Sequence, residues 1–154
     1  MKTYQQLVEE QAKEIEEIFP WDLEEMLQDA PDTFLLDIRE PDEFNAAHIP
    51  GSINVPRGLL EGACDWNYDD TVPELVKARD QKVVVICRSG NRSVLAAYTM
   101  KMMGFENPVS LKTGIRGWND YEQPIINQQA QTVDIDTGDE LFASVVRPDQ
   151  LAPK

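Results

Sequence analysis

A cysteine between a buried strand and a helix is the feature of this sequence with the clearest chemical potential. Cys87 directly follows the β-branched run Lys82–Ile86, which is typical of a strand covered on both faces. The next residues predict an amphipathic helix with apolar positions at Val94, Leu95, Tyr98 and Met102. The pattern therefore places a thiol where a strand passes through a tight polar turn into a helix.

The turn itself favours negative charge on that thiol. Only the thiolate form of cysteine is a nucleophile, so a reactive cysteine needs surroundings that stabilise an anion. The unpaired N–H groups at the start of a helix bind anions. Gly90 allows the backbone to curl, and Arg88 and Arg92 add positive charge. An inert thiol at a strand end explains neither the glycine nor the arginines, so we expect Cys87 to be reactive.

The overall charge limits the class of ligand. The 154 residues carry a formal net charge of -14, which argues against binding to nucleic acids or to an anionic membrane surface. Residues 87–116 reverse this balance, because Glu106 is the one acidic residue among five basic ones: Arg88, Arg92, Lys101, Lys112 and Arg116. A basic segment in so acidic a chain is expected where a small anion binds.

The termini and the cysteine count bear on location. Residues 1–20 have neither the apolar core nor the cleavage site of a secretory signal, and no stretch approaches the length of a membrane span. We therefore expect a cytoplasmic protein. Two cysteines cannot form a disulfide framework, and in a reducing compartment both are expected to be free thiols.

The alternation of strands and helices predicts the fold class. Apolar runs predict strands at residues 33–37, 53–55, 82–86 and 107–111, and the segments between them include helices after Pro20 and over 72–79. We expect an α/β domain of three layers, with a parallel sheet of about five strands and helices on both faces. Residues 3–19 predict an acidic amphipathic helix, whose apolar stripe packs either on its own domain or on a partner. Residues 57–71 predict a long surface loop.

Four further residues have both a structural and a chemical interpretation. Asp37 and Arg39 lie at a strand end, where α/β proteins bind ligands, although charges there more often hold loops in place. Because His48 is the only histidine, a multi-histidine metal site is excluded. His48 is either a general base or a residue that fixes a loop. Cys64 is either a small buried hydrophobic residue or a resolving or sulfur-accepting thiol within reach of Cys87.

Three motifs in the same order resemble the rhodanese family of sulfurtransferases in its single-domain form. They are Asp37–Pro56, with Asp37-Ile-Arg39 and His48-Ile-Pro-Gly51; the loop Cys87–Ser93; and the closing segment Gly104–Trp118. The resemblance covers residues 17–125 and implies a rhodanese-like domain there. It leaves residues 1–16 as an amphipathic helical extension and 126–154 as an acidic tail of unassigned structure. Two departures border the expected pocket: Thr113 replaces the first of two glycines, and residues 121–123 replace a small, glycine-containing segment.

The resemblance implies a mechanism. Catalytic Cys87 would take a sulfane sulfur from an anionic donor such as thiosulfate and pass the sulfur from its persulfide to a thiol, including a protein thiol, or to cyanide. The substrate would be bound by the loop residues Arg88, Ser89, Gly90, Asn91, Arg92 and Ser93. No metal or organic cofactor would be required.

Two alternatives stay open at this point. The first is a sulfur carrier or persulfide sensor, in which a protein partner loads Cys87 and free thiosulfate is hardly used. The second is a phosphatase, since the dual-specificity phosphatases also place a cysteine on such a loop. Their loop has one residue more than the four between Cys87 and Arg92. The tighter ring favours a sulfur atom over a phosphate.

Overall fold

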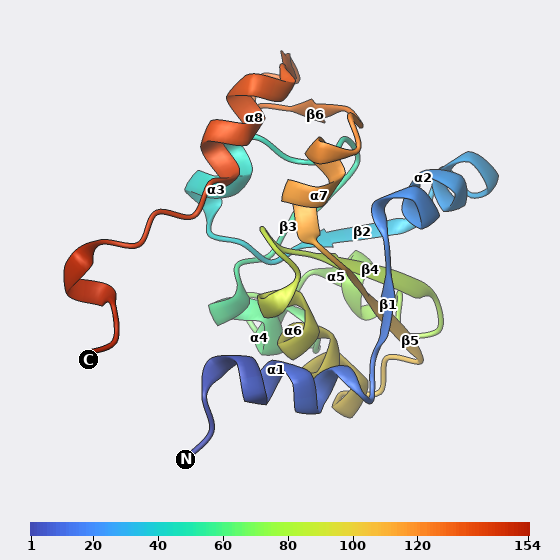
Figure 1. Ribbon diagram of the computed structural model, residues 1–154. Coiled ribbons are helices and arrows are strands. Elements are labelled where there is room, and N and C mark those ends of the chain that lie inside the picture. The colour runs from blue at the N-terminus through green and yellow to red at the C-terminus, as the bar shows by residue number, and fades with distance from the viewer.

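A parallel five-stranded sheet forms the centre of the protein, in a computed structural model that describes residues 1–154. The strand order is β1-β5-β4-β2-β3 (Figure 1). The strands are Glu16–Ile18 (β1), Phe34–Asp37 (β2), Ile53–Asn54 (β3), Lys82–Ile86 (β4) and Asn107–Leu111 (β5). The prediction of a parallel α/β sheet of about five strands is confirmed.

Helices cover both faces of the sheet, as expected (Figure 1). One face packs against α4 (Leu60–Ala63), α5 (Pro73–Val76) and α6 (Asn91–Met102), and α1 (Tyr4–Ala12) lies against α6. The other face packs against α2 (Pro20–Asp29), α7 (Gly114–Asp120) and α8 (Ile135–Phe142). The remaining elements are α3 (Pro41–Ala46), the antiparallel pair β6 (Ile125–Ile126) and β7 (Thr132–Val133), and 3-10 turns at Arg57–Leu59 and Pro148–Gln150.

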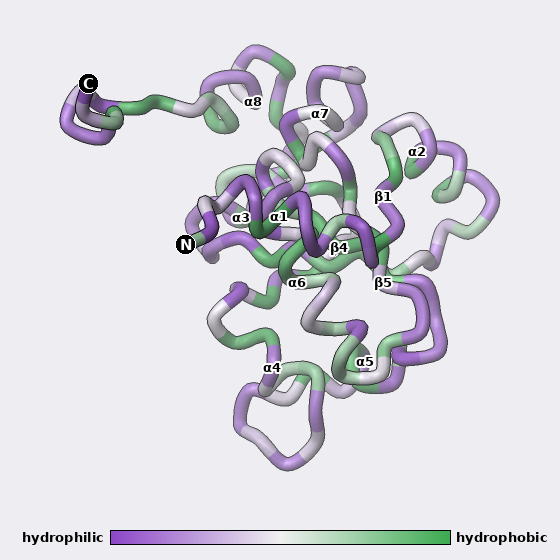
Figure 2. The backbone as a smooth tube through the Cα atoms, turned by 60° about the horizontal axis from the view of Figure 1, so that its bottom comes forward, coloured by the Kyte–Doolittle hydropathy of each residue, from purple (hydrophilic) through white to green (hydrophobic).

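Strand β4 is buried on both sides, which explains its unbroken apolar sequence. Val83 and Val85 belong to the core cluster beneath α6, while Val84 and Ile86 belong to the cluster beneath α7. Figure 2 shows this hydrophobic stretch inside the fold. Burying each such side chain stabilises the fold by about 1.5–3 kcal/mol. Side-chain packing on both faces therefore fixes the strand that directly precedes Cys87.

The predicted helix over residues 3–19 is wrong beyond Ala12. Residues 16–18 form the edge strand β1, which pairs with β5. Ile15 is buried in one core cluster and Ile18 in the other, so the segment serves both faces of the sheet as a strand does. A helix would place both isoleucines on one face. The shorter α1 packs against α6 of its own chain.

The burial of two other segments also differs from the prediction. In α6 the predicted Val94 is buried together with Ala96, Ala97 and Met100, whereas the predicted Met102 is exposed. Small side chains let the helix approach the sheet closely, so its buried face includes alanines and leaves a larger apolar side chain in solvent. Residues 57–71 are not a simple surface loop, because they include the 3-10 turn, α4 and the fully buried Leu60.

The C-terminal region after β6 has more structure than the sequence predicted. It contains β7 and α8, and α8 packs against α7. Residues beyond α8 run away from the rest of the fold (Figures 1 and 2). None of the helices has the length and apolar character needed to span a membrane.

Candidate active site

Cys87 lies at the C-terminal end of β4, in a turn whose N–H groups point at its sulfur. The side chain is 1% exposed. The backbone N–H of Gly90 donates to Sγ at 3.1 Å, and the N–H of Ser93 donates to it at 3.3 Å. Helix α6 begins at Asn91, so the positive end of its dipole also faces this sulfur. Donors in this position would stabilise negative charge on the sulfur, which is the arrangement that the sequence predicts for this turn.

A hydroxyl pair extends this environment to the neighbouring strand. Ser93 Oγ lies 3.3 Å from Cys87 Sγ and 2.7 Å from Ser110 Oγ. Both serines are fully buried. Ser110 was missed from the sequence, although a polar residue inside the apolar strand Asn107–Leu111 was the signal that could have found it. In the thiolate form, the Ser93 hydroxyl can donate to sulfur while it accepts from Ser110.

The backbone of the segment after β5 packs directly against the Cys87 turn. Gly90 has a φ of +96°, and a Cβ there would lie 3.1 Å from the backbone nitrogen of Thr113. Gly114 has a φ of +63°, and its Cβ would collide with the carbonyl groups of Cys87 and Arg88. These carbonyls accept hydrogen bonds from the N–H groups of residues 115 and 116 at 2.9 and 3.0 Å. Gly90 and Gly114 therefore allow the Cys87 turn and the segment after β5 to approach each other closely.

Thr113, one of the two departures from the family pattern, adopts a left-handed backbone with a φ of +69°. This region favours glycine, and a β-branched residue is strained there. Its side chain packs directly on Gly117, where a Cβ would collide with Thr113 Oγ1. In the second departure, Glu122 also has a positive φ, of +61°.

The two arginines of the turn differ in their contacts. Arg92 forms an ion pair with Glu43 of α3, with 3.2 Å between Nη2 and Oε2, and this pair is partly exposed. Such a pair is worth about 0–1 kcal/mol, so an anionic ligand can displace Glu43 at low cost. Arg88 is half-buried and takes part in none of the seven ion pairs of the chain. The other loop side chains, Ser89 and Asn91, are exposed.

The predicted basic segment is divided in space. Lys101 lies at the far end of α6, where it donates to the backbone oxygen of Glu14 at 2.9 Å. Lys112 lies 5.4 Å from the centre of the Phe19 ring, in a cation–π contact. Arg116 is exposed. Arg88 and Arg92 are the basic residues within the loop itself, while the backbone N–H of Arg116 bonds to the Arg88 carbonyl beside it.

Asp37 and Arg39 form a buried ion pair that holds the loop after β2. Arg39 Nε and Nη2 donate to the Asp37 carboxylate at 2.8–3.1 Å, and Nη2 also donates to the Ala47 carbonyl at 2.7 Å. His48 Nδ1 lies 2.9 Å from the carbonyl oxygen of Phe44, and the His48 and Phe44 rings stack. These contacts agree with the structural interpretation of all three residues.

Cys64 has the surroundings of a structural cysteine. It is fully buried in the core cluster beneath α6, and burial raises the pKa of its thiol to about 12. The residue is thus a protonated, inaccessible thiol, which favours its interpretation as a small buried hydrophobic residue. Both cysteines are free.

Tyr4 of α1 was not among the predicted site residues, although it lies near the turn. Helix α1 packs against α6, which begins at Asn91 just after the turn. Burial raises the pKa of the Tyr4 hydroxyl, and the nearby Cys87 raises it further, while Arg92 and Arg88 lower it. The hydroxyl therefore stays protonated near neutral pH.

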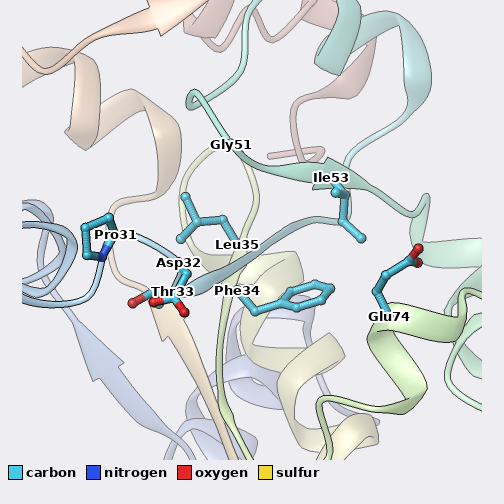
Figure 3. A pocket seen from close by; sticks show the side chains of 8 residues that line it. All are labelled: Pro31, Asp32, Thr33, Phe34, Leu35, Gly51, Ile53 and Glu74. Carbon is cyan, nitrogen blue, oxygen red and sulfur yellow. The ribbon is translucent and has the colours of Figure 1, made fainter.

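Two other observations concern ligand sites. No group of three or more His, Cys, Asp or Glu side chains is placed to hold a metal ion. A cavity of about 260 Å³ opens at the start of β2, at the opposite end of the strand from the turn (Figure 3). Asp32 and Glu74 give it acidic walls, so it does not suit an anion.

Comparison with known proteins identifies the fold family. The rhodanese-like domain matches residues 20–121, about two thirds of the chain. The chain belongs to the rhodanese-like domain family. It is 32% identical over 112 residues to a protein named sulfurtransferase from Allochromatium vinosum, covering 73% of this chain and 95% of that protein. The resemblance seen in the three motifs is confirmed.

Two further relatives of this rhodanese-like chain carry different names. A putative sulfur carrier protein, YrkF of Bacillus subtilis, is 38% identical over 85 residues, which cover 54% of this chain and 40% of the relative. The chain thus spans less than two thirds of that curated relative. A solved structure from Rhodopseudomonas palustris, described as a possible tyrosine phosphatase, has 31% identity and a TM-score of 0.74, with coverage of 81% of this chain and 95% of that chain.

Proposed function

We propose that this rhodanese-like protein is a sulfurtransferase that carries sulfur as a persulfide on Cys87. The supporting observation is the convergence of the Gly90 and Ser93 N–H groups on Cys87 Sγ, since donors in that position stabilise a thiolate and the anionic persulfide formed from it. The other loop residues, Arg88, Ser89, Asn91 and Arg92, would border the substrate.

The first half-reaction loads the sulfur. The Cys87 thiolate attacks the sulfane sulfur of thiosulfate and forms an S–S bond. The bond between that sulfur and the sulfonate breaks, and sulfite leaves with the electron pair. Arg92, once released from Glu43, would hold the anionic end of the donor. In the second half-reaction cyanide or a thiol removes the outer sulfur and restores the Cys87 thiolate.

Intact mass spectrometry tests this proposal. The protein is incubated separately with thiosulfate, glutathione persulfide and 3-mercaptopyruvate, and we expect the mass of one sulfur atom to be added and then removed by a reductant. The adduct should be absent in Cys87→Ser and present in Cys64→Ala. A sulfur adduct that persists in Cys87→Ser would refute the assignment of Cys87.

A sulfur-carrier function is the second candidate, supported by the name of the Bacillus subtilis relative. Thiocyanate formation from thiosulfate and cyanide distinguishes the two. Turnover that depends on Cys87 identifies an enzyme, whereas a stable Cys87 persulfide without turnover identifies a carrier.

A phosphatase is a third candidate, supported by the description of the Rhodopseudomonas palustris structure. The loop of this chain argues against it, because four residues between Cys87 and Arg92 form a smaller ring than phosphatases use. We expect no hydrolysis of an aryl phosphate. Hydrolysis that disappears in Cys87→Ser would overturn the sulfurtransferase assignment.

A further inference from the structure

A small cavity adjoins the Cys87 turn between α3 and α8. It has a volume of about 90 Å³ and its lining consists of Arg39, Glu43, Ala46, Arg88, Leu141 and Phe142. Arg88 directly follows Cys87, and Glu43 is the ion-pair partner of Arg92. The cavity therefore borders one end of the loop through Arg88, and the ion-pair partner of Arg92 at the other end of the loop. Its volume is several times that needed by one water molecule, which suits a short organic ligand.

Helix α8 is a fixed wall of this cavity. Asn119 of α7 donates to the carbonyl of Ile135 and to the Asp139 carboxylate, both at 3.0 Å. Gly138 lies so close to Asn119 that a Cβ would come within 2.7 Å of its side-chain nitrogen. Phe142 is 3% exposed and belongs to the core. Figure 1 shows α8 beside α3.

Two of the three apolar residues that line the cavity come from outside the segment that matches the family. Leu141 and Phe142 follow the matched residues 20–121 by about twenty positions. Leu141 is 44% exposed, so its side chain is available to a ligand. This wall belongs to the C-terminal region of this particular chain.

The charged residues that line the cavity would bind a ligand with one negative charge. Arg39 is matched by Asp37 at 2.8 Å, and Glu43 is matched by Arg92 at 3.2 Å. Arg88 is the remaining charged group, and it has no ion-pair partner. A guanidinium group binds a carboxylate with two parallel hydrogen bonds. An aliphatic stem would at the same time contact Leu141.

We propose that this cavity is an acceptor subsite for a short aliphatic thiol that bears one carboxylate, and that Leu141 is a specificity-determining residue. This inference rests on the sulfurtransferase function proposed above. The acceptor's carboxylate binds Arg88 and its methylene groups pack on Leu141, so its sulfur lies beside the Cys87 turn.

The transfer step is balanced without an added oxidant or reductant. The acceptor thiolate attacks the outer sulfur of the Cys87 persulfide and forms a new S–S bond. The bond between Cys87 Sγ and that sulfur breaks, and its electron pair stays on Cys87 as a thiolate. The product is the persulfide of the acceptor.

The test compares three acceptors for protein loaded with sulfur: 3-mercaptopropionate, 2-mercaptoethanol and cyanide. Initial transfer rates give kcat/KM for each acceptor in the wild type, Leu141→Ala, Arg88→Gln and the control Leu151→Ala. Leu151 is exposed and does not belong to the lining of this cavity. Circular dichroism checks that each variant is folded.

We expect Leu141→Ala to lower the preference for 3-mercaptopropionate over cyanide about tenfold, as loss of a few methylene contacts does in other sites. Arg88→Gln should remove the preference for 3-mercaptopropionate over 2-mercaptoethanol. Leu151→Ala should change neither ratio.

Two negative results are distinguishable. Unchanged acceptor ratios in Leu141→Ala, in protein that loads sulfur and delivers it to cyanide, would overturn the subsite and leave the sulfurtransferase function standing. Failure of every donor to load Cys87 would overturn both.

Discussion

The hydrogen bond from Gly90 to Cys87 can be tested by adding one methyl group. Gly90 has a φ of +96°, and its N–H donates to Cys87 Sγ at 3.1 Å. In Gly90→Ala the new Cβ would lie 3.1 Å from the Thr113 nitrogen and 3.3 Å from the Leu111 oxygen. Both are backbone atoms, so we expect the turn to move and this hydrogen bond to lengthen.

The magnitude has two parts. A left-handed backbone costs an alanine about 1–2 kcal/mol of stability. A hydrogen bond to a charged group contributes about 1.5–3 kcal/mol. Loss of half of that contribution from the thiolate, about 0.75–1.5 kcal/mol, would slow the reaction of Cys87 about three- to tenfold at neutral pH, since about 1.4 kcal/mol corresponds to a factor of ten.

Gly104→Ala provides the matched control. Gly104 has nearly the same φ, +93°, but a Cβ there meets no atom within 4 Å. Urea denaturation measures stability, and alkylation by iodoacetamide measures Cys87 reactivity, since Cys64, with a pKa raised to about 12, stays protonated and unreactive. Both variants should lose about 1–2 kcal/mol of stability, and only Gly90→Ala should react more slowly. Equal alkylation rates in the two variants would refute the role given to the Gly90 N–H.

Three further predictions concern stability. Burial raises the pKa of Cys64 to about 12, so the folded state keeps this proton to higher pH than the unfolded chain. The free energy of unfolding should therefore fall by about 1.4 kcal/mol per pH unit above about pH 9. Urea titrations in this range should show a flatter slope for Cys64→Ala, and an unchanged slope contradicts the burial argument. Arg39→Ala leaves Asp37 buried without its partner and should lower the free energy of unfolding by about 3–5 kcal/mol. Arg147→Ala, in an exposed pair, should lower it by about 0–1 kcal/mol. Similar losses for the two variants in thermal unfolding would contradict this prediction. Thr113→Gly should gain about 1 kcal/mol by relieving the φ of +69°, and Gly117→Ala should be less harmful in that background than in the wild type; additive effects in the double variant would show that the two positions do not interact.

The strands and helices that were predicted correctly have strong local patterns. The unbroken apolar run of β4 and the Pro20 start of α2 depend on a few adjacent residues. Ile15 and Ile18 are three residues apart, a spacing that fits one helix face and predicts a helix over residues 16–18. Pairing with β5, more than ninety residues away in the sequence, decides that they form a strand instead.

The tail was not interpretable for a related reason. Leu141 and Phe142 form an apolar pair among acidic residues, with no strong pattern around them. Their role depends on Asn119 and Gly138, which bring α8 against α7. Nothing near Leu141 in the sequence indicates that Arg88 borders the same cavity.

Residue types at short spacing are enough to predict the α/β class, the place of Cys87 between a strand and a helix, and the size of the loop that ends at Arg92. Which groups surround the sulfur depends instead on contacts between distant segments. The contact of Ser93 with Ser110, the pairing of Arg92 with Glu43 and the cavity under α8 each join distant segments, and only strand register and helix packing bring such segments together.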